Sequence, residues 1–221
     1  MAKPFSKLVA LLTPKRRWAQ FSLLTLFLVV TVLCVGLRLV VVPAEKQRRA
    51  VAAIKALGGR VDYVKPSEEA SEAFPRPFLR RWLPQDYFDE VRKVDFRFDQ
   101  GNQVTDAGLA HLLGLSALQE LNLNGSTHVT DAGMAHLQGL TRLQMLLLGG
   151  TQVTDAGLAH LHEMTELHVL DLFGIQVNDA GLAHLHGLTG LQTLFLSGTQ
   201  VTDARLAQLR QALPNCKIVG P

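Results

Sequence analysis

The chain has 221 residues, with 22 basic against 19 acidic side chains and a formal net charge of +3. So small an excess of charge argues against nucleic-acid binding over the whole surface. Two cysteines, Cys34 and Cys216, are too few for a disulfide-stapled scaffold or a metal site built from a cysteine cluster. The mean hydropathy of +0.16 is high for a soluble protein, and its source is local.

A long apolar run near the N-terminus raises the mean hydropathy. It carries no charge from Trp18 to Leu37, and after Arg38 it continues to Val42. About 20 apolar residues at ~1.5 Å per residue span the ~30 Å hydrocarbon core of a bilayer. We therefore predict one transmembrane helix at residues 18–42, after a basic tail at residues 1–17. A cleaved signal peptide is the alternative, although its apolar stretch normally has only about 7–15 residues.

Basic residues flank both ends of this run, and the tail before it contains no acid. The positive-inside rule, which counts lysines and arginines near the ends of a span, slightly favours a cytoplasmic N-terminus. The expected topology is single-pass, with the bulk of the chain outside the cytoplasmic membrane.

Residues 43–90 are predicted to be a helical linker that ends in a cap. Pro43 is expected to kink or break the preceding helix, and residues 44–57 carry apolar side chains at helical spacing. Residues 60–64 have the composition of a short strand. Residues 78–91 are rich in aromatic side chains, which suits a cap over the exposed end of a repeat array.

The rest of the chain repeats the motif V-T-D-A-G-L-A-H-L at offsets of 25, 24, 24 and 24 residues, with Met134 or Asn178 as single changes in the second and fourth copies and a degenerate fifth copy, V-T-D-A-R-L-A-Q-L. In each copy leucines recur first at three-residue spacing, typical of a helix, and then at alternate positions, typical of a strand. One strand and one helix bury their apolar faces only when copies stack, which predicts a parallel sheet on one side and helices on the other. The copies begin at Val104, Val129, Val153, Val177 and Val201.

Both ends of the array have recognisable partial units. A leading strand is expected at residues 94–98, with Phe96 and Phe98 in the places that Leu121 and Leu123 hold in the next unit. At the other end, residues 213–219 have the pattern of half a unit that closes with a short strand.

The L-x-x-L-x-L pattern in register with V-T-D-A-G-L resembles leucine-rich repeats, and more narrowly the GALA-like and cysteine-containing classes. The resemblance covers residues 91–221. With the basic N-terminus, the single span and the A-A-I-K-x-L-G-G-x-V segment, the chain resembles bacterial membrane-anchored leucine-rich-repeat proteins, most of which lack an assigned activity. The resemblance implies an α/β leucine-rich-repeat solenoid, with strands on its concave side and short helices on its convex side.

The repeats depart from these families in three respects. No cysteine occupies a repeat position, and no F-box precedes the repeats, so the ubiquitin-ligase role of some relatives is not expected. The asparagine ladder of better-known repeats is also absent. Its positions hold Ser126, Thr151, Ile175 and Thr199.

Two ladders of ionisable residues could suggest chemistry. The histidines could form a metal-binding or pH-sensing row, to which His162 and His186 add two H-x-H patterns. Residues two apart on a helix do not face each other, however, and no cysteine or paired carboxylate stands nearby to complete a set of ligands. Duplication of one exposed helix position explains them better. A calcium site needs several converging oxygens, so helix capping explains the aspartates better. We expect no metal, no cofactor and no enzymatic activity. The ladders are His111, His136, His160 and His184, and Asp106, Asp131, Asp155, Asp179 and Asp203.

The residues between the inward-pointing strand leucines should face outward on the concave side, where they change along the array from charged to apolar. Contiguous exposed apolar patches with aromatic residues often mark interaction sites. We therefore predict a membrane-anchored module that binds a protein or peptide on its concave face. A structural or self-associating cell-envelope component is the alternative. The predicted contacts are Met145, Leu147, Val169, Phe173 and Phe195, with Arg97, Glu120 and Asp171 for orientation.

Overall fold

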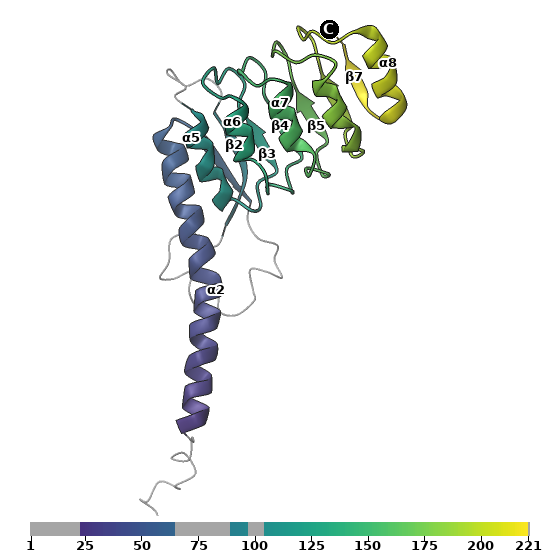
Figure 1. Cartoon of the computed structure of the whole chain (residues 1–221). Coiled ribbons are helices and arrows are strands. Elements are labelled where there is room, and N and C mark those ends of the chain that lie inside the picture. Colours follow the sequence, from purple (N-terminus) through teal and green to yellow (C-terminus); the bar gives the residue numbers. More distant parts are fainter. Residues whose placement is uncertain (1–22, 65–88, 97–103, 221) are drawn as a thin grey trace, which may run out of the picture. The chain divides into compact units, whose positions relative to one another are not determined.

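The computed structural model describes residues 23–64, 89–96 and 104–220 (Figure 1). The chain divides into two compact units, Met1–Val42 and Pro43–Pro221. Helix α2 (Leu23–Ala56) runs through Pro43, so the predicted helix break there is wrong. Proline removes only one backbone hydrogen bond, and helix-forming sequence lies on both sides of it.

The prediction of a membrane-spanning helix at residues 18–42 is not confirmed. Residues 18–22, with which it begins, lie outside the described residues. Within the described part of the chain, no helix combines the length and the apolar character needed to span a bilayer.

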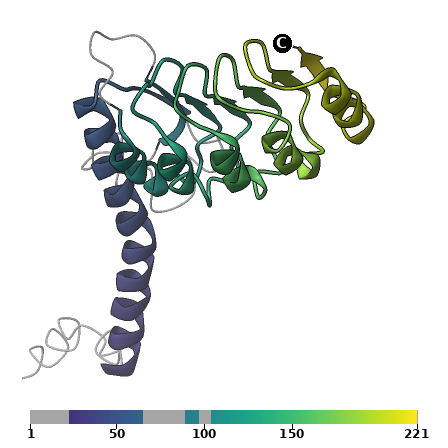
Figure 2. The same ribbon diagram turned by 45° about the horizontal axis from the view of Figure 1, so that its top comes forward.

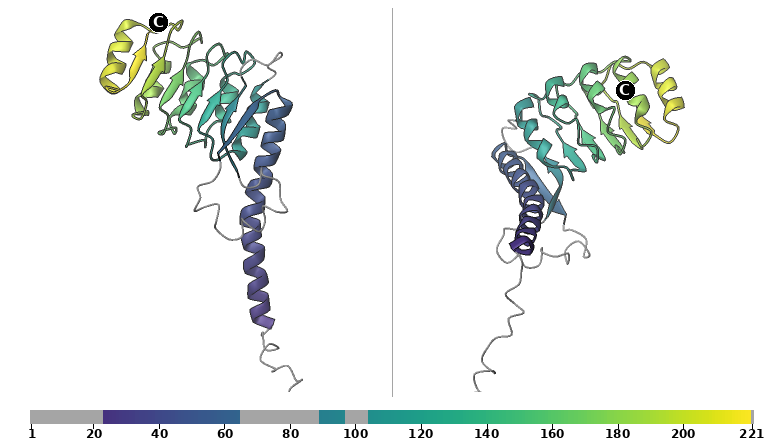
Figure 3. Two further views of the ribbon diagram at one scale, coloured as in Figure 1. Left: turned by 180° about the vertical axis from the view of Figure 1, so that it is seen from behind. Right: turned by 60° about the horizontal axis from the view of Figure 1, so that its bottom comes forward.

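A seven-stranded sheet with its strands in sequence order forms the second unit (Figures 1 and 2). From β2 onward all neighbouring strands are parallel, whereas β1 pairs with β2 in antiparallel fashion. The view from behind shows the strands in front of the helices, so helices cover only one face of the sheet (Figure 3). The strands are β1 (Arg60–Val64), β2 (Glu90–Asp95), β3 (Glu120–Asn122), β4 (Met145–Leu147), β5 (Val169–Asp171), β6 (Thr193–Phe195) and β7 (Lys217–Val219).

The covering helices are short, and several of them are 3-10 rather than α-helical. Each repeat has only about 24 residues for a strand, a helix and two connections, so long helices do not fit. They are α5 (Asp106–Leu109), η2 (Ala110–Gly114), α6 (Asp131–Ala135), α7 (Asp155–Leu158), η3 (Ala159–Leu161), η4 (Gly181–Gly187) and the longer α8 (Asp203–Ala212).

Leucines from both halves of each repeat form one continuous core between the sheet and the helices. The predicted helical face of Leu109, Leu112 and Leu115 is no more than 1% exposed, and so are the strand leucines Leu121 and Leu146. Burial of each such side chain contributes about 1.5–3 kcal/mol. The stacked strand-and-helix units confirm the predicted leucine-rich-repeat solenoid.

The C-terminal part of α2 and strand β1 cover the first end of this core. Ala50, Val51 and Ile54 of α2 are at most 4% exposed and belong to the same cluster. The Gln47 side-chain amide donates to the Asp89 carbonyl at 2.6 Å and joins α2 to the start of β2. The predicted helix at 44–57 and strand at 60–64 are therefore present. The predicted aromatic cap lies almost wholly at residues 65–88, outside the described residues.

The leading strand has a different register from the predicted one. β2 ends at Asp95, and Val94, rather than Phe96, pairs with Leu121. Phe96 follows at the place that Leu123 holds and is 3% exposed. At the other end of the array β7 pairs with β6, which confirms the closing strand.

The aspartate ladder joins each repeat to the next one. Asp106 accepts hydrogen bonds from the Thr130 amide at 2.8 Å and from the Thr130 hydroxyl at 2.7 Å. Asp131 makes the same pair of bonds with Thr154, both at 2.7 Å. Asp179 accepts from the amide and hydroxyl of Thr202 at 2.9 and 2.8 Å. In the remaining described bridge Asp155 accepts only an amide, because Asn178 replaces the threonine.

Helix capping was therefore the wrong explanation for the aspartates. The N-cap residue is the threonine, and its hydroxyl accepts a helix amide at Thr130 and Thr202 but not at Thr105 or Thr154. The adjacent aspartate directs its oxygens to the next repeat, because stacking brings an amide and a hydroxyl there within reach.

The glycine of the motif leaves room for this bridge. A Cβ atom on Gly133 would collide with a carboxylate oxygen of Asp106 and would lie 2.9 Å from Leu109 Cδ1. Gly157 and Gly181 stand in the same relation to the preceding aspartates. The missing side chain therefore lets adjacent helices approach closely in these repeats. The bridge does not require a glycine, because Arg205 holds this position in the fifth repeat and Asp179 still bonds to Thr202.

Replacement of Asp131 by alanine tests the bridge. We expect Asp131→Ala to lower the free energy of unfolding by about 1–3 kcal/mol, because two hydrogen bonds to a charged group are lost. Urea unfolding of the full chain in mild detergent, followed by circular dichroism, measures the change. Asp203→Ala is the matched control, because in the described part of the chain no amide of a following repeat reaches Asp203. We expect a change within about 0.5 kcal/mol. Equal losses in the two variants would show that the aspartates act only within their own helices.

The pH dependence of stability provides a second test. The Thr202 amide, then the Thr202 hydroxyl and the charge of Arg205, lower the pKa of Asp179 below its usual 3.8, against the opposite effect of desolvation. A lowered folded-state pKa gives stability that is present above the unfolded-state pKa and is lost as the pH falls through the folded-state value. We expect the urea midpoint to fall as the pH drops below about 5 and through 3.8, and to fall less in Asp179→Asn. Identical pH profiles would contradict a stabilising charge at Asp179.

Candidate interaction surface

The sheet has one face free of helices, which we call the sheet face (Figure 3). Strand pairing aligns its outward residues into two rows, and the backbone hydrogen bonds after the strands continue them into a third. The first row is Lys93, Glu120, Met145, Val169, Thr193 and Lys217. The second is Asp95, Asn122, Leu147, Asp171, Phe195 and Val219. The third is Asn124, Gly149, Phe173 and Ser197.

All five apolar residues predicted to bind a partner lie on the sheet face, and together we call them the apolar patch: Met145, Leu147, Val169, Phe173 and Phe195. Phe173 is 59% exposed and Phe195 37%. The other three side chains are partly buried by their neighbours. Asp171 stands between Leu147 and Phe195 in the second row, so a carboxylate lies inside the apolar patch.

The three polar residues predicted to orient the partner differ in their surroundings. Glu120 forms an ion pair with Lys93 at 3.3 Å across neighbouring strands. Arg97 lies outside the described residues, and the register of β2 assigns the sheet-face positions of that strand to Lys93 and Asp95 instead. Asp171 is on the sheet face, where it takes part in a hydrogen-bond network.

This network crosses three repeats and was not predicted. The Asn124 side-chain amide donates to Asp171 Oδ2 at 3.2 Å, and Asn124 Oδ1 accepts from the Gly149 amide at 2.7 Å. Asp171 Oδ1 accepts from the Phe173 amide at 2.9 Å, and Asn122 Oδ1 accepts from the Asn124 amide at 3.0 Å. The network fixes the Asp171 carboxylate and the backbone that carries Phe173. In the sequence, the only sign of this network was that Asn122, Asn124 and Asp171 occupy outward positions of the strand segments.

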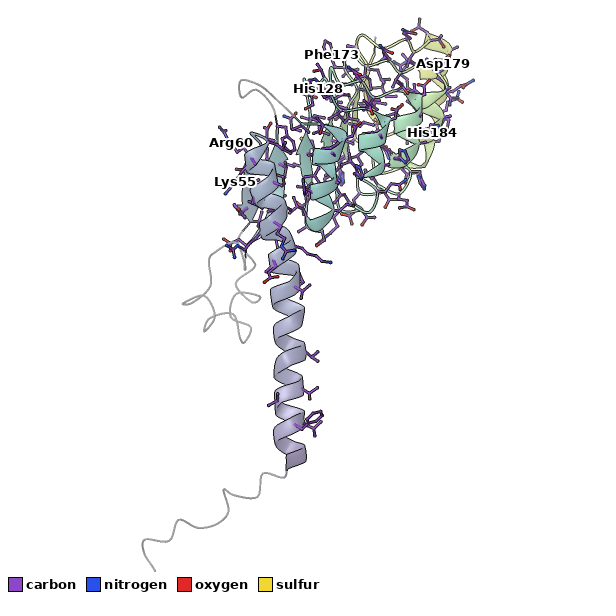
Figure 4. The ribbon with its side chains drawn as sticks, turned by 60° about the vertical axis from the view of Figure 1, so that its left-hand side comes forward. Lys55, Arg60, His128, Phe173, Asp179 and His184 are labelled. Atoms are coloured by element: carbon purple, nitrogen blue, oxygen red, sulfur yellow. The ribbon has the colours of Figure 1, made fainter. Side chains whose placement is uncertain are left out.

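The helix side carries the histidine ladder, of which Figure 4 labels His184. His111 and His184 are exposed, whereas His136 and His160 are partly buried. His160 Nδ1 lies 2.7 Å from the side-chain nitrogen of Gln138. Among the described residues no three histidine, cysteine or acidic side chains are grouped so that they could hold a metal ion.

Two hollows lie away from the sheet face. One of about 440 Å³ lies between the fourth and fifth repeats, where Asp179 and Arg205 line it. The other, of about 160 Å³, lies beside β1 and β2 and includes Glu90, Arg92 and Arg142. Neither hollow is lined by a residue of the three sheet-face rows.

Comparison with known proteins gives only structural similarities. No protein-family model matches the chain, and no curated protein matches it. An internalin of Listeria monocytogenes (inlF) is similar to 53% of the chain over 32% of its own length, with 30% identity and a TM-score of 0.46. Internalin C2 of the same organism is similar to 50% of the chain over 44% of its own length, with 31% identity and a TM-score of 0.43.

The leucine-rich-repeat ectodomain of the receptor kinase SOBIR1 from Arabidopsis thaliana is also similar to the chain. It covers 79% of the chain over 90% of its own length, with 14% identity and a TM-score of 0.48. The chain spans less than half the length of the two internalins. Its assignment as a leucine-rich-repeat protein rests on its own geometry of one strand and one helix per repeat.

Proposed function

We propose that the chain is a leucine-rich-repeat interaction module that binds a protein or peptide on its sheet face. The apolar patch is the observation that carries the proposal. In the described part of the second unit only four large apolar side chains are more than a third exposed to solvent: Val64, Leu113, Phe173 and Phe195. Two of the four lie together on the sheet face. Aromatic side chains on a rigid surface are the groups that contribute most to protein recognition.

The rigidity of the sheet also supports this proposal. β4, β5 and β6 are held by ladder hydrogen bonds on both sides and by buried leucines beneath them. A surface that is already in its binding conformation loses little conformational entropy when a partner binds. The proposal includes no catalytic activity and no cofactor.

We extend the proposal to membrane attachment from the sequence alone. The uncharged run from Trp18 to Leu37 is long enough for one span, with the N-terminus in the cytoplasm and the repeats outside the cytoplasmic membrane. Such attachment would display the sheet face to partners at the cell surface or in the envelope.

Substitutions at the two exposed phenylalanines test the binding surface. We expect Phe173→Lys with Phe195→Lys to reduce the crosslinked capture of a specific protein from membranes by about tenfold or more, as for loss of aromatic hot spots. Mass spectrometry of the crosslinked product identifies and quantifies the partner. Both positions face solvent, so circular dichroism should show an unchanged fold.

The matched control is Leu113→Lys with Val64→Lys, which changes two exposed apolar side chains elsewhere. It should retain the captured protein. Crosslinking of the chain only to a second copy, lost in the phenylalanine variant, would favour the self-associating envelope component. An unchanged set of captured proteins in the phenylalanine variant would contradict a role for the sheet face.

Membrane attachment has a separate test. The full chain should remain in the pellet when membranes are washed with alkaline carbonate, and Leu24→Lys with Val30→Lys should release it. Each lysine near the centre of a span costs about 2.5–3.5 kcal/mol. Ala52→Lys with Ala56→Lys is the matched control, because both alanines are exposed farther along α2. Release of the unsubstituted chain by carbonate would contradict a transmembrane anchor.

A further inference from the structure

We infer that the partner inserts an arginine side chain between Phe173 and Phe195, against the carboxylate of Asp171. The inference rests on the proposed binding function of the sheet face and specifies the chemistry of what binds there. Figure 4 labels Phe173, the most exposed of the three side chains.

Strand geometry brings the three side chains together. Asp171 on β5 pairs with Phe195 on β6, so the two residues are neighbours across the sheet, about 4.8 Å apart along the hydrogen-bond direction. Phe173 follows Asp171 by two residues, just beyond the end of β5, and its amide donates to Asp171 Oδ1 at 2.9 Å. Asp171 therefore has Phe195 as its neighbour on the next strand and Phe173 two residues farther along its own chain segment.

The charge of Asp171 is not neutralised by a neighbour on the sheet face. Glu120, the nearest other carboxylate of the face described above, is paired with Lys93. The sheet-face residues of β4 to β6 are uncharged apart from Asp171. In the described part of the chain, Asp171 has no basic side chain within ion-pair distance. A single negative charge within an apolar surface is complementary to a single positive charge flanked by apolar groups.

The carboxylate retains the capacity to bind further donors. It accepts two hydrogen bonds, from the Phe173 amide and the Asn124 side chain, whereas a carboxylate has about four acceptor sites. These two bonds hold its plane fixed before a partner arrives. A pre-oriented acceptor loses less entropy on binding than a freely rotating one.

Arginine suits this site better than lysine. Its planar guanidinium group stacks on aromatic rings and at the same time donates paired hydrogen bonds to a carboxylate. Apolar residues on either side of the arginine would cover Met145, Leu147 and Val169. The inferred ligand is therefore a peptide segment in which one arginine lies among apolar residues.

Selection from a phage-displayed library of random 12-residue peptides tests the inference, with the full chain immobilised in detergent micelles. We expect peptides with arginine among apolar residues to be enriched. A synthetic copy in which citrulline replaces the arginine should bind about tenfold more weakly or worse, because citrulline keeps the shape and loses the charge. Asp171→Asn should weaken the arginine peptide by a similar factor and should not weaken the citrulline peptide further.

Two further variants separate direct contact from a change in folding. Glu120→Gln removes the sheet-face carboxylate that is paired with Lys93 and should change the affinity by less than about twofold, because that charge is already neutralised. Phe195→Leu keeps an apolar side chain and should weaken the arginine peptide severalfold through loss of the aromatic face. Added salt should weaken binding to the unsubstituted chain more than to Asp171→Asn.

The possible outcomes distinguish this inference from the proposed function. The selected peptides could instead be apolar or contain lysine, and could bind Asp171→Asn as well as the unsubstituted chain. If Phe173→Lys with Phe195→Lys abolishes the binding of such peptides, the inference is overturned and the sheet face remains a binding surface. If no selected peptide is lost in the phenylalanine variant, both the inference and the proposed function fail.

Discussion

The aspartate bridge between neighbouring repeats is the interaction on which the stack depends. Apolar burial alone holds leucines together without fixing how far one repeat is turned or shifted against the next. The bonds from Asp131 to the amide and hydroxyl of Thr154 fix both, because they require one relative position of two polar groups. Gly157 then allows the helices to approach to that position. The T-D-A-G sequence thus forms a joint between two neighbouring repeats, to which one repeat supplies the aspartate and the next supplies the threonine and the glycine.

This joint provides polar links between repeats in a chain that lacks the asparagine ladder of better-known repeats. The hydroxyls at two of those positions, Thr151 and Thr199, donate to carbonyls three residues earlier in their own repeats at 2.7 Å. They close turns and do not link repeats. On the sheet face, side chains link neighbouring repeats through the Asn124 network, the Lys93–Glu120 ion pair and the hydroxyl of Ser197, which donates to the Gly220 carbonyl at 2.8 Å. The exposed side chains of Phe173 and Phe195 belong to none of these links. Positions whose side chains take no part in these links can hold exposed phenylalanines without loss of folding stability.

Local patterns predicted most elements, and long-range pairing decided the rest. The helix at 44–57 and the repeating units follow from spacings within a few residues. The register of β2 does not, because Val94, Phe96 and Phe98 form an alternating series that satisfies two registers, and only pairing with Leu121 selects one. The partners of the aspartates and of Asn124 are likewise 23 to 47 residues away in sequence. Of the candidate site, the alternation identified the apolar residues of the face, whereas the network that holds Asp171 needed the stacked geometry.

Comparison of the copies within the chain shows where they differ. The helix-side histidine is identical in four copies, His111, His136, His160 and His184, although it is exposed or only partly buried. The equivalent first-row positions of the sheet face hold four different residues, Glu120, Met145, Val169 and Thr193. Duplication followed by uniform drift would alter two such solvent-accessible rows to a similar extent. The copies also differ away from the sheet face, at the position that holds Ala117, Arg142, Glu166 and Gly190. Variation along the first row is nevertheless what the proposed binding surface requires, because such a surface presents a distinct side chain at each point of contact.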